Sequence, residues 1–406
     1  MLLLATCSER PAASFVTSVP WGLIGPTVIL DSHAHTRFSD GASEPLEVAR
    51  AASANGCGAL AITDHGDTSV RAATPAYFDA IDAARLAFPD LIVFAGMEWN
   101  IPPYKHREHV TVLLDQMHER TVLPEFKASF EVEAASASDA LKWLASKISS
   151  PNQAVLIYNH PSRRDTDESE NLKDVKTWQA THKLFAAFEG GPGHQRAASP
   201  GVYQGAFRTD NRWDPAVAKI GGAWDQLLAD GSDFWGALAV SDYHNEQLDF
   251  APCSFARTHV RVPQRDQQGV LAGLRAGSFW AAHGRILDDL AFIAAVPELP
   301  LPATPGESVR VSSGSGVVYR LQLRRSASTR GQPLVVELIG NVRTGSTESL
   351  VVAEIKPEQD TFDWKPDTLV AGKDGRSAYV RARVSARDAA GAPLLAYTNP
   401  IRLVLK

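Results

Sequence analysis

The sequence predicts an α/β domain followed by a smaller all-β domain. From residue 27 to about 290, short β-branched or apolar runs alternate with segments of helical period, which indicates a mostly parallel sheet, open or closed into a barrel. Beyond four prolines between residues 297 and 305 the helical period disappears, and short strands alternate with Gly, Ser and Asp turns. We therefore expect an arm at residues 1–26, an α/β domain at 27–295 and a β-sandwich-like domain at 306–406.

The elements of the first domain follow from these patterns in order. The first predicted helix has Ser43 as its N-cap, Pro45 in its first turn and Gly56 just past its end. The predicted strands are 27–30, 59–63, 91–94, 110–114, 154–158, 185–188 and 236–240. The predicted helices are 44–55, 75–88, 137–149, 170–183, 215–230 and 265–277. In the second domain the predicted strands are 308–312, 317–323, 334–338, 350–355, 378–384 and 401–405.

Composition excludes several classes of protein. Of the 406 residues, 44% are hydrophobic and 21% charged, so the chain can bury a sizeable core and is not disordered or fibrous. The net charge is −6 without a long basic run, which argues against a nucleic-acid polymer as partner. The three cysteines (Cys7, Cys57 and Cys253) are widely spaced, so we expect neither a disulfide, nor a redox role, nor a Cys-based zinc site.

The N-terminus leaves two alternatives open. The run from Met1 to Cys7 is similar to the end of an export signal before a lipidated cysteine, although it lacks a positive segment and Thr6 is unusual there. It could equally be a frayed end. Residues 8–25 are expected to form a linker or extended arm. No stretch approaches the roughly 18 apolar residues of a membrane span. We expect an exported protein, periplasmic or lipid-anchored, with a cytoplasmic location as the alternative.

Polar side chains follow almost every predicted strand of the first domain. Histidine and carboxylate side chains at successive strand ends would be costly to bury unless paired or bound to metal, and the carboxyl edge of parallel strands is where sites are built. Alternation along the strand places His33 and His35 on one face. Each motif alone is weak, since an isolated His-x-His is more often structural. The motifs are Asp31-Ser32-His33-Ala34-His35, Ser39-Asp40-Gly41, Thr63-Asp64-His65, Gly96-Met97-Glu98, Asn159-His160-Pro161 and Ser241-Asp242-Tyr243-His244.

Taken together over residues 28–290, these motifs resemble the PHP (polymerase and histidinol phosphatase) superfamily. The resemblance implies a distorted seven-stranded β/α barrel with up to three divalent ions at one face. It implies that His33, His35 and Asp242 hold one ion, that Glu98 bridges to a second held by His109 and His160, and that Asp40, His65 and His244 hold the third.

His109 fits the strand-end pattern least well, because it precedes its predicted strand. His106 is the alternative metal ligand. His109 is preferred because it directly adjoins the strand 110–114, as in the family. The segments around Gly96–Asn100 and Glu189–Gln195, with Thr398–Ile401 in the β domain, also resemble an exported bacterial branch and, more diffusely, carbaryl-hydrolase-type metallohydrolases.

The expected chemistry is hydrolysis by a metal-bound hydroxide. Imidazole and carboxylate ligands without thiolate suit two or three ions of Zn, Mn or Fe. Asp64 is expected to orient a ligand histidine, and His194 to act as general acid. Arg163 and Arg164 are the candidates for binding a substrate anion, with Arg37 and Lys105 weaker.

Three functions are compatible with these residues. The first is a phosphoesterase acting on a small-molecule substrate. The second is a carboxylic or carbamate ester hydrolase with the same metal centre. The third is a non-enzymatic exported binding protein whose β domain contacts a partner. The full ligand set favours an enzyme, and no residue reports the oligomeric state.

Overall fold

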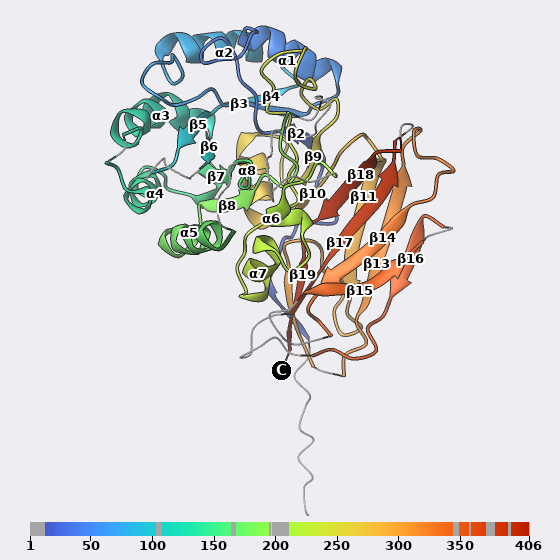
Figure 1. Ribbon diagram of the computed structural model, residues 1–406. Helices are drawn as coiled ribbons and strands as arrows, with labels where there is room; N and C mark the ends of the chain where they lie inside the picture. Colours follow the sequence, from blue (N-terminus) through green and yellow to red (C-terminus); the bar gives the residue numbers. More distant parts are fainter. Residues whose placement is uncertain are drawn as a thin grey trace, which may run out of the picture.

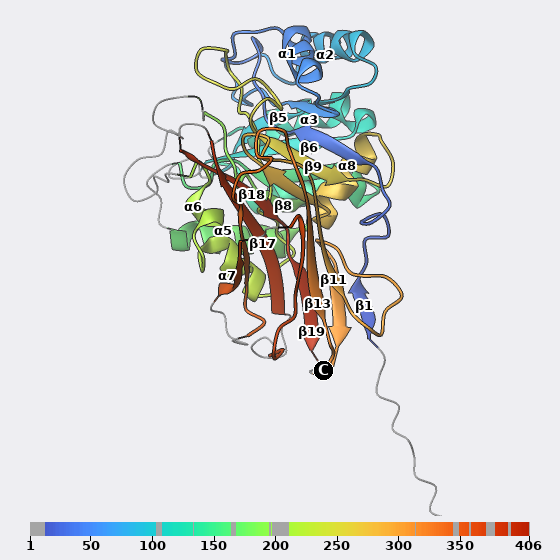
Figure 2. The same cartoon turned by 90° about the vertical axis from the view of Figure 1, so that its right-hand side faces the viewer.

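The computed structural model describes most of the chain in two parts that lie side by side. In Figure 1 helices α1 to α5 surround the short strands of the first part, and the orange and red strands of the second part pack against its other side; Figure 2 shows the same two parts turned by 90°. The described residues are 13–102, 108–132, 134–163, 168–194, 196, 211–312, 314–343, 349–356, 359–370, 378–388 and 391–405.

The helices cover the first part of the chain. The helices are α1 (Pro45–Ala54), α2 (Pro75–Ala87), α3 (Gln116–Phe130), α4 (Ala137–Ser146), α5 (Glu168–Thr181), α6 (Pro215–Ala218), α7 (Ala223–Ala229) and α8 (Gln267–Ala276), with a 3₁₀ turn at Pro151–Gln153. Helix α1 begins after Glu44, which forms a capping box with Glu47, so the prediction of Ser43 as N-cap was wrong. The sequence did not predict α3, because Pro124 lies inside it.

The strands of the first part fall into two sheets. They are β2 (Thr27–Asp31), β3 (Ala59–Ile62), β4 (Ile92–Ala95), β5 (Met97–Asn100), β6 (His109–Leu114), β7 (Ala154–Tyr158), β8 (Phe185–Phe188), β9 (Arg257–Arg261) and β10 (Phe279–Ala282). Strands β2, β3 and β4 are parallel, and β5 to β8 form a separate sheet in which β6 is antiparallel to both neighbours. The prediction of a mixed α/β fold is confirmed, whereas the described residues show no single closed sheet.

The predicted strand at 236–240 was wrong, because side chains take the place of a backbone partner. Only isolated parallel bridges form there, from Trp235 to Ala187 and from Ala239 to Gly191. On the other side the Thr258 hydroxyl both accepts from the Ala239 amide at 2.9 Å and donates to the Ala239 carbonyl at 3.0 Å. This segment therefore lines one edge of β8 without joining a regular ladder.

The second part is all-β, as predicted, and its sheet continues into the first part. Strand β10 pairs with β9 on one side and with β18 on the other, so one sheet runs from β4 in the first part to β12 and β1. Strand β11 pairs with β13, and its buried side chains belong to the hydrophobic core of the all-β part. The strands are β1 (Ser14–Thr17), β11 (Leu287–Ala295), β12 (Ser308–Val311), β13 (Val318–Arg325), β14 (Val335–Gly340), β15 (Leu350–Ile355), β16 (Thr361–Trp364), β17 (Ala378–Arg387), β18 (Pro393–Thr398) and β19 (Ile401–Leu405).

Buried polar contacts join the two parts. Asp225 on α7 accepts hydrogen bonds from Arg381 Nε at 2.8 Å and Nη2 at 3.0 Å and from the Tyr379 hydroxyl at 2.8 Å. Asn399 accepts from the amides of Gly236 and Ala237 and donates to the carbonyl of Gly277. Burying a charge is costly unless it is paired, so these contacts fix the β strands against the α/β part.

A disulfide joins Cys57 and Cys253, which contradicts the prediction that the cysteines would remain unpaired. The two residues are 196 positions apart in sequence, and the turn after α1 lies next to the loop before β9 only in the folded chain. Spacing in sequence carries no signal for such a pair.

Among the described residues, no helix is both long and apolar enough to cross a lipid bilayer.

We predict that Asp225→Ala lowers the free energy of unfolding by about 3–5 kcal/mol, because it leaves the Arg381 charge buried without its carboxylate partner. The matched control is Asp363→Ala, which breaks a bidentate Arg–Asp pair whose side chains are 50% and 45% exposed. Its expected cost is below about 1 kcal/mol. Urea unfolding measures both, and equal effects would contradict the proposed role of the buried pair.

We also predict that replacing Cys57 and Cys253 by serine lowers the free energy of unfolding by about 2–5 kcal/mol, because the unfolded chain gains the freedom that the bridge removes. Cys7→Ser, which leaves the bridge intact, serves as the control. Unfolding of the oxidised proteins in urea provides the measurement. A double variant as stable as the wild type would show that the bridge does not stabilise the fold.

Candidate metal centre

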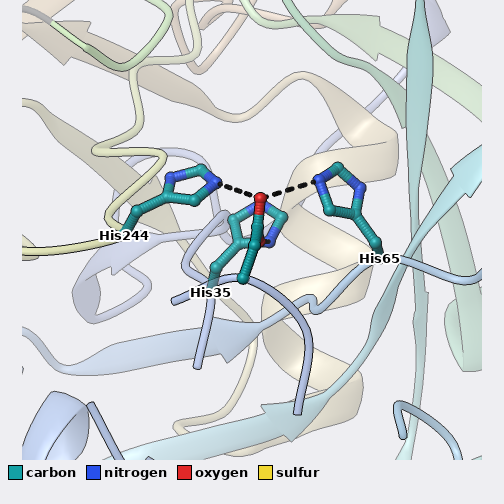
Figure 3. A group of neighbouring side chains, drawn as sticks. His35, His65 and His244 are labelled. Carbon is teal, nitrogen blue, oxygen red and sulfur yellow. Dashed lines mark ion pairs between the residues drawn. The ribbon is translucent and has the colours of Figure 1, made fainter. Parts of the chain in front are cut away.

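The strand ends bring the predicted ligands together, as the sequence led us to expect. His33 and His35 follow β2, His65 follows β3, and His160 follows β7, while Glu98 lies within β5. Figure 3 shows His35, His65 and His244 turned toward one another. Between them lies the carboxylate of Asp40, 3.5 Å from His65 Nε2 and 3.4 Å from His244 Nε2.

His109 reaches the same place from the opposite end of a strand. It is the first residue of β6, which runs antiparallel to β5 and β7, and it lies opposite Asn100. The beginning of an antiparallel strand lies beside the ends of its neighbours. The position that strand-end reasoning could not explain therefore follows from the direction of β6.

Glu98 lies at the centre of the group. Its side chain is 1% exposed, and imidazole nitrogens surround both carboxylate oxygens. Burial alone raises the pKa of Glu98, but His109, His33 and His65 outweigh it and hold the pKa well below its usual value. The distances are 2.9 Å to His65 Nδ1, 2.9 Å to His109 Nδ1, 3.3 Å to His33 Nε2, 3.3 Å to His160 Nε2 and 3.4 Å to His35 Nε2.

The second buried carboxylate is Asp242, which faces the first two histidines. Its Oδ1 lies 3.4 Å from His33 Nε2 and 3.3 Å from His35 Nε2. Burial raises the pKa of Asp242, but His33 and His194 outweigh it and keep the pKa well below its usual value. Both Asp242 and His160 have positive φ, a backbone conformation that non-glycine residues rarely adopt and that recurs at functional sites.

These residues fit a cluster of divalent cations. His33 Nε2 and His35 Nε2 lie only 3.0 Å apart, an approach that a shared cation stabilises. The buried oxygens Glu98 Oε2 and Asp242 Oδ1 make no hydrogen bond to the described residues, and buried polar atoms normally have a partner. Groups of three or four ligand atoms close enough to share one ion recur across the site. Nitrogen and carboxylate donors without sulfur suit Zn, Mn or Fe.

Two further carboxylates, which were not among the predicted site residues, contact the outer nitrogens of these histidines. Glu189 Oε1 lies 2.7 Å from His33 Nδ1, and Glu108 Oε2 lies 2.9 Å from His160 Nδ1. A carboxylate on the outer nitrogen of a metal-binding histidine fixes its orientation and tautomer. The available signals were Glu189 at the end of the sixth predicted strand and Glu108 directly before His109.

Arg163 and Asp64 make contacts other than those predicted. Arg163 Nη2 lies 2.9 Å from the buried carboxylate of Glu108, and the Arg163 side chain is 23% exposed. Asp64 accepts hydrogen bonds from the Thr36 amide, the Thr36 hydroxyl and Ser39. It orients His35 only through Ser39, whose hydroxyl is 3.3 Å from His35 Nδ1.

The structure describes only some of the remaining predicted residues. Arg37 is exposed and donates to the Ala42 carbonyl. Arg164, Lys105 and the alternative ligand His106 lie outside the described residues, as does Cys7. His194 has a carboxylate on each ring nitrogen, Asp242 at 2.9 Å and Asp249 at 2.8 Å, so the general-acid prediction gains no support from its contacts.

Two histidines outside the ligand set are core residues. His259 stacks on Trp280 with ring centroids 3.8 Å apart, and His283 packs between the rings of Trp213 and Phe255. Burial lowers the pKa of each to about 3. They are therefore neutral near pH 7, and neither belongs to a group of described residues that could hold a metal ion.

Comparison with known proteins identifies the first part of the chain. Residues 31–130 match the family model of the PHP domain. An uncharacterized protein of Methanocaldococcus jannaschii is 30% identical over 158 residues, which are 36% of this chain and 63% of that protein; the chain thus spans less than two thirds of that relative. This match of residues 31–130 to the PHP domain confirms the resemblance to the PHP superfamily.

Two solved structures are similar to the chain at low identity. One is a two-domain protein from Bacteroides vulgatus containing a predicted PHP-like metal-dependent phosphoesterase, with 15% identity, a TM-score of 0.44, and 93% of this chain and 95% of that chain covered. The other is an amidohydrolase from Chromobacterium violaceum with bound sulfate and no metal, with 16% identity, a TM-score of 0.34, and 55% of this chain and 89% of that chain covered.

Near the site, the buried carboxyl group of Glu131 makes the stability of the fold depend on pH. It accepts hydrogen bonds from the Asn100 amide at 2.8 Å and Nδ2 at 3.2 Å, and burial raises its pKa from 4.5 to about 7. Because the folded-state pKa exceeds that of the unfolded chain, ionisation opposes folding. We expect the contribution of Glu131 to the free energy of unfolding to fall as the pH rises from about 4.5 to about 7.

Glu131→Gln should remove this fall. Relative to the wild type, the variant is expected to gain about 2 kcal/mol of unfolding free energy between pH 4.5 and 8. Glu125→Gln changes a carboxylate that is 56% exposed and serves as the control. Urea unfolding across this pH range tests the prediction, and parallel curves for wild type and Glu131→Gln would contradict it.

Proposed function

We propose that the protein is a metal-dependent phosphoesterase that hydrolyses a small-molecule phosphoester at a centre of three divalent ions. The observation that carries the proposal is the contact of one buried carboxylate, Glu98, with five imidazoles. Nine side chains would hold the ions: His33, His35, Asp40, His65, Glu98, His109, His160, Asp242 and His244.

The charge of this ligand set favours an anionic substrate. Six of the nine proposed ligands are neutral when they bind metal, and only Asp40, Glu98 and Asp242 carry negative charge. When bound, divalent ions supply hydroxide at neutral pH and neutralise oxygens around the reacting phosphorus. Three such ions exceed the charge of three carboxylates, so the centre would attract a phosphate group more strongly than a neutral ester.

The residues of the chain would hold this centre and keep it in one arrangement. Glu98 would contribute to holding more than one ion, and Asp242 would hold one ion together with His33 and His35. Glu189 and Glu108 would fix the orientations of His33 and His160 from outside. Asp64 would act through Ser39 on His35.

We further propose that the two sheets of the first part belong to one distorted seven-stranded barrel. Isolated parallel bridges connect segments that the regular ladders leave apart: His65 to Glu98, Ala187 to Trp235, Gly191 to Ala239 and Ala34 to Tyr243. Added to the ladders from β2 to β4 and from β5 to β8, these bridges lead from segment to segment back to β2.

We propose that the protein is exported. The Cys57–Cys253 disulfide supports this, because disulfides persist in oxidising compartments and are rare in the cytosol.

The proposed activity predicts that purified protein retains divalent metal and cleaves a nitrophenyl phosphate. Chelation should abolish turnover, and His33→Ala should reduce it at least about 100-fold, because His33 would hold an ion. The control is His182→Ala, at a residue outside the cluster whose ring accepts from the Leu184 amide.

A naphthyl ester panel, including carbamates, tests the specificity of the same site. Metal-dependent cleavage of esters without cleavage of phosphates would replace the phosphoesterase proposal with an ester hydrolase. Turnover unchanged by both chelation and His33→Ala would overturn metal-dependent hydrolysis altogether.

A further inference from the structure

The two oxygens of the Asp242 carboxylate contact different histidines. Its Oδ1 faces His33 and His35, whereas its Oδ2 lies 2.9 Å from His194 Nε2. The other ring nitrogen of His194, Nδ1, lies 2.8 Å from Oδ1 of Asp249, which is fully buried. A chain of contacts therefore runs from Asp249 through His194 to the outer oxygen of Asp242.

Asp249 also holds the last predicted ligand in place. Its Oδ2 accepts hydrogen bonds from the His244 amide at 2.7 Å and from the Asn245 amide at 3.3 Å. One buried carboxylate thus supports the backbone of His244 with one oxygen and the ring of His194 with the other. These residues lie beyond the part of the chain that matches the PHP family model.

The local backbone is shaped to bring His194 to Asp242. His194 has a φ of 57°, in the left-handed region that non-glycine residues rarely adopt. A Cβ on the preceding Gly193 would overlap Asp242 Cβ and the Ser241 carbonyl. The loop after β8 therefore passes so close to the segment 241–242 that only glycine fits, and the strained His194 follows directly.

We propose that His194, held by Asp249, is a positioning residue for Asp242, an inference that rests on the proposed metal centre. By donating to Oδ2, His194 would leave Oδ1 to bind the ion shared with His33 and His35. Without this contact the Asp242 side chain could rotate or bind the ion through both oxygens. The pair would thereby set the affinity of the site for that ion.

The test is titration of metal-free protein with Zn²⁺ or Mn²⁺ alone, with bound metal counted by elemental analysis. His194→Ala and Asp249→Asn are each expected to weaken one binding step about 10–100-fold, with the same number of ions bound at saturating metal. His194→Gln, which keeps an N–H donor, should recover part of the affinity. Circular dichroism and the Tm of the metal-free variants check that they fold.

The matched control is His118→Ala. His118 also carries an aspartate, Asp115, on its Nδ1, and its side chain is 21% exposed, against 22% for His194. It does not belong to any group of described residues that could hold a metal ion. Its removal is expected to leave every binding step unchanged.

The outcomes separate this inference from the proposed function. Normal affinity in a folded His194→Ala protein would overturn the positioning role and leave the metal centre standing. Loss of one whole equivalent at saturating metal would also overturn it, since His194 would then be a ligand itself. A wild-type protein that bound no divalent ion would overturn the proposed function, and this inference with it.

Discussion

The site depends on the burial of Glu98 among five imidazoles. A carboxylate taken out of water is unfavourable unless positive charge compensates it, and neutral histidines cannot supply that charge in full. Both oxygens of Glu98 face ring nitrogens, and Oε2 makes no hydrogen bond to the described residues. Cations bound between these groups would turn a costly arrangement into a stable one.

The fold supplies this arrangement by directing strand ends to one place. Parallel β2 and β3 contribute the residues that follow them, and antiparallel β6 contributes its first residue, His109. The all-β part also supports the α/β part. Strand β18 pairs with β10 and so extends the sheet, and the side chains of Arg381 and Asn399 form hydrogen bonds with residues of the α/β part. Its strands and the α/β part thus belong to one continuous structure.

The clustering of the candidate ligands could be predicted from sequence because these residues lie in short motifs next to strands. What escaped prediction depends on contacts between distant segments. Glu108 is defined only by its approach to His160, and Asp249 only by its approach to His194. Cys57 and Cys253 form a disulfide although 196 positions separate them in sequence. Likewise, the strand predicted at 236–240 fails because the side chains of Thr258 and Asn399 occupy its backbone groups.

The most direct test of metal binding around Glu98 is anomalous X-ray diffraction from crystals of the protein as purified, measured at the absorption edges of Zn, Mn and Fe. The structure predicts up to three anomalous peaks clustered around the Glu98 carboxylate, each within bonding distance of histidine nitrogens. Crystals soaked in Zn²⁺ or Mn²⁺ that showed no peak near Glu98, or peaks only at surface residues, would contradict the assignment of these residues as a metal centre.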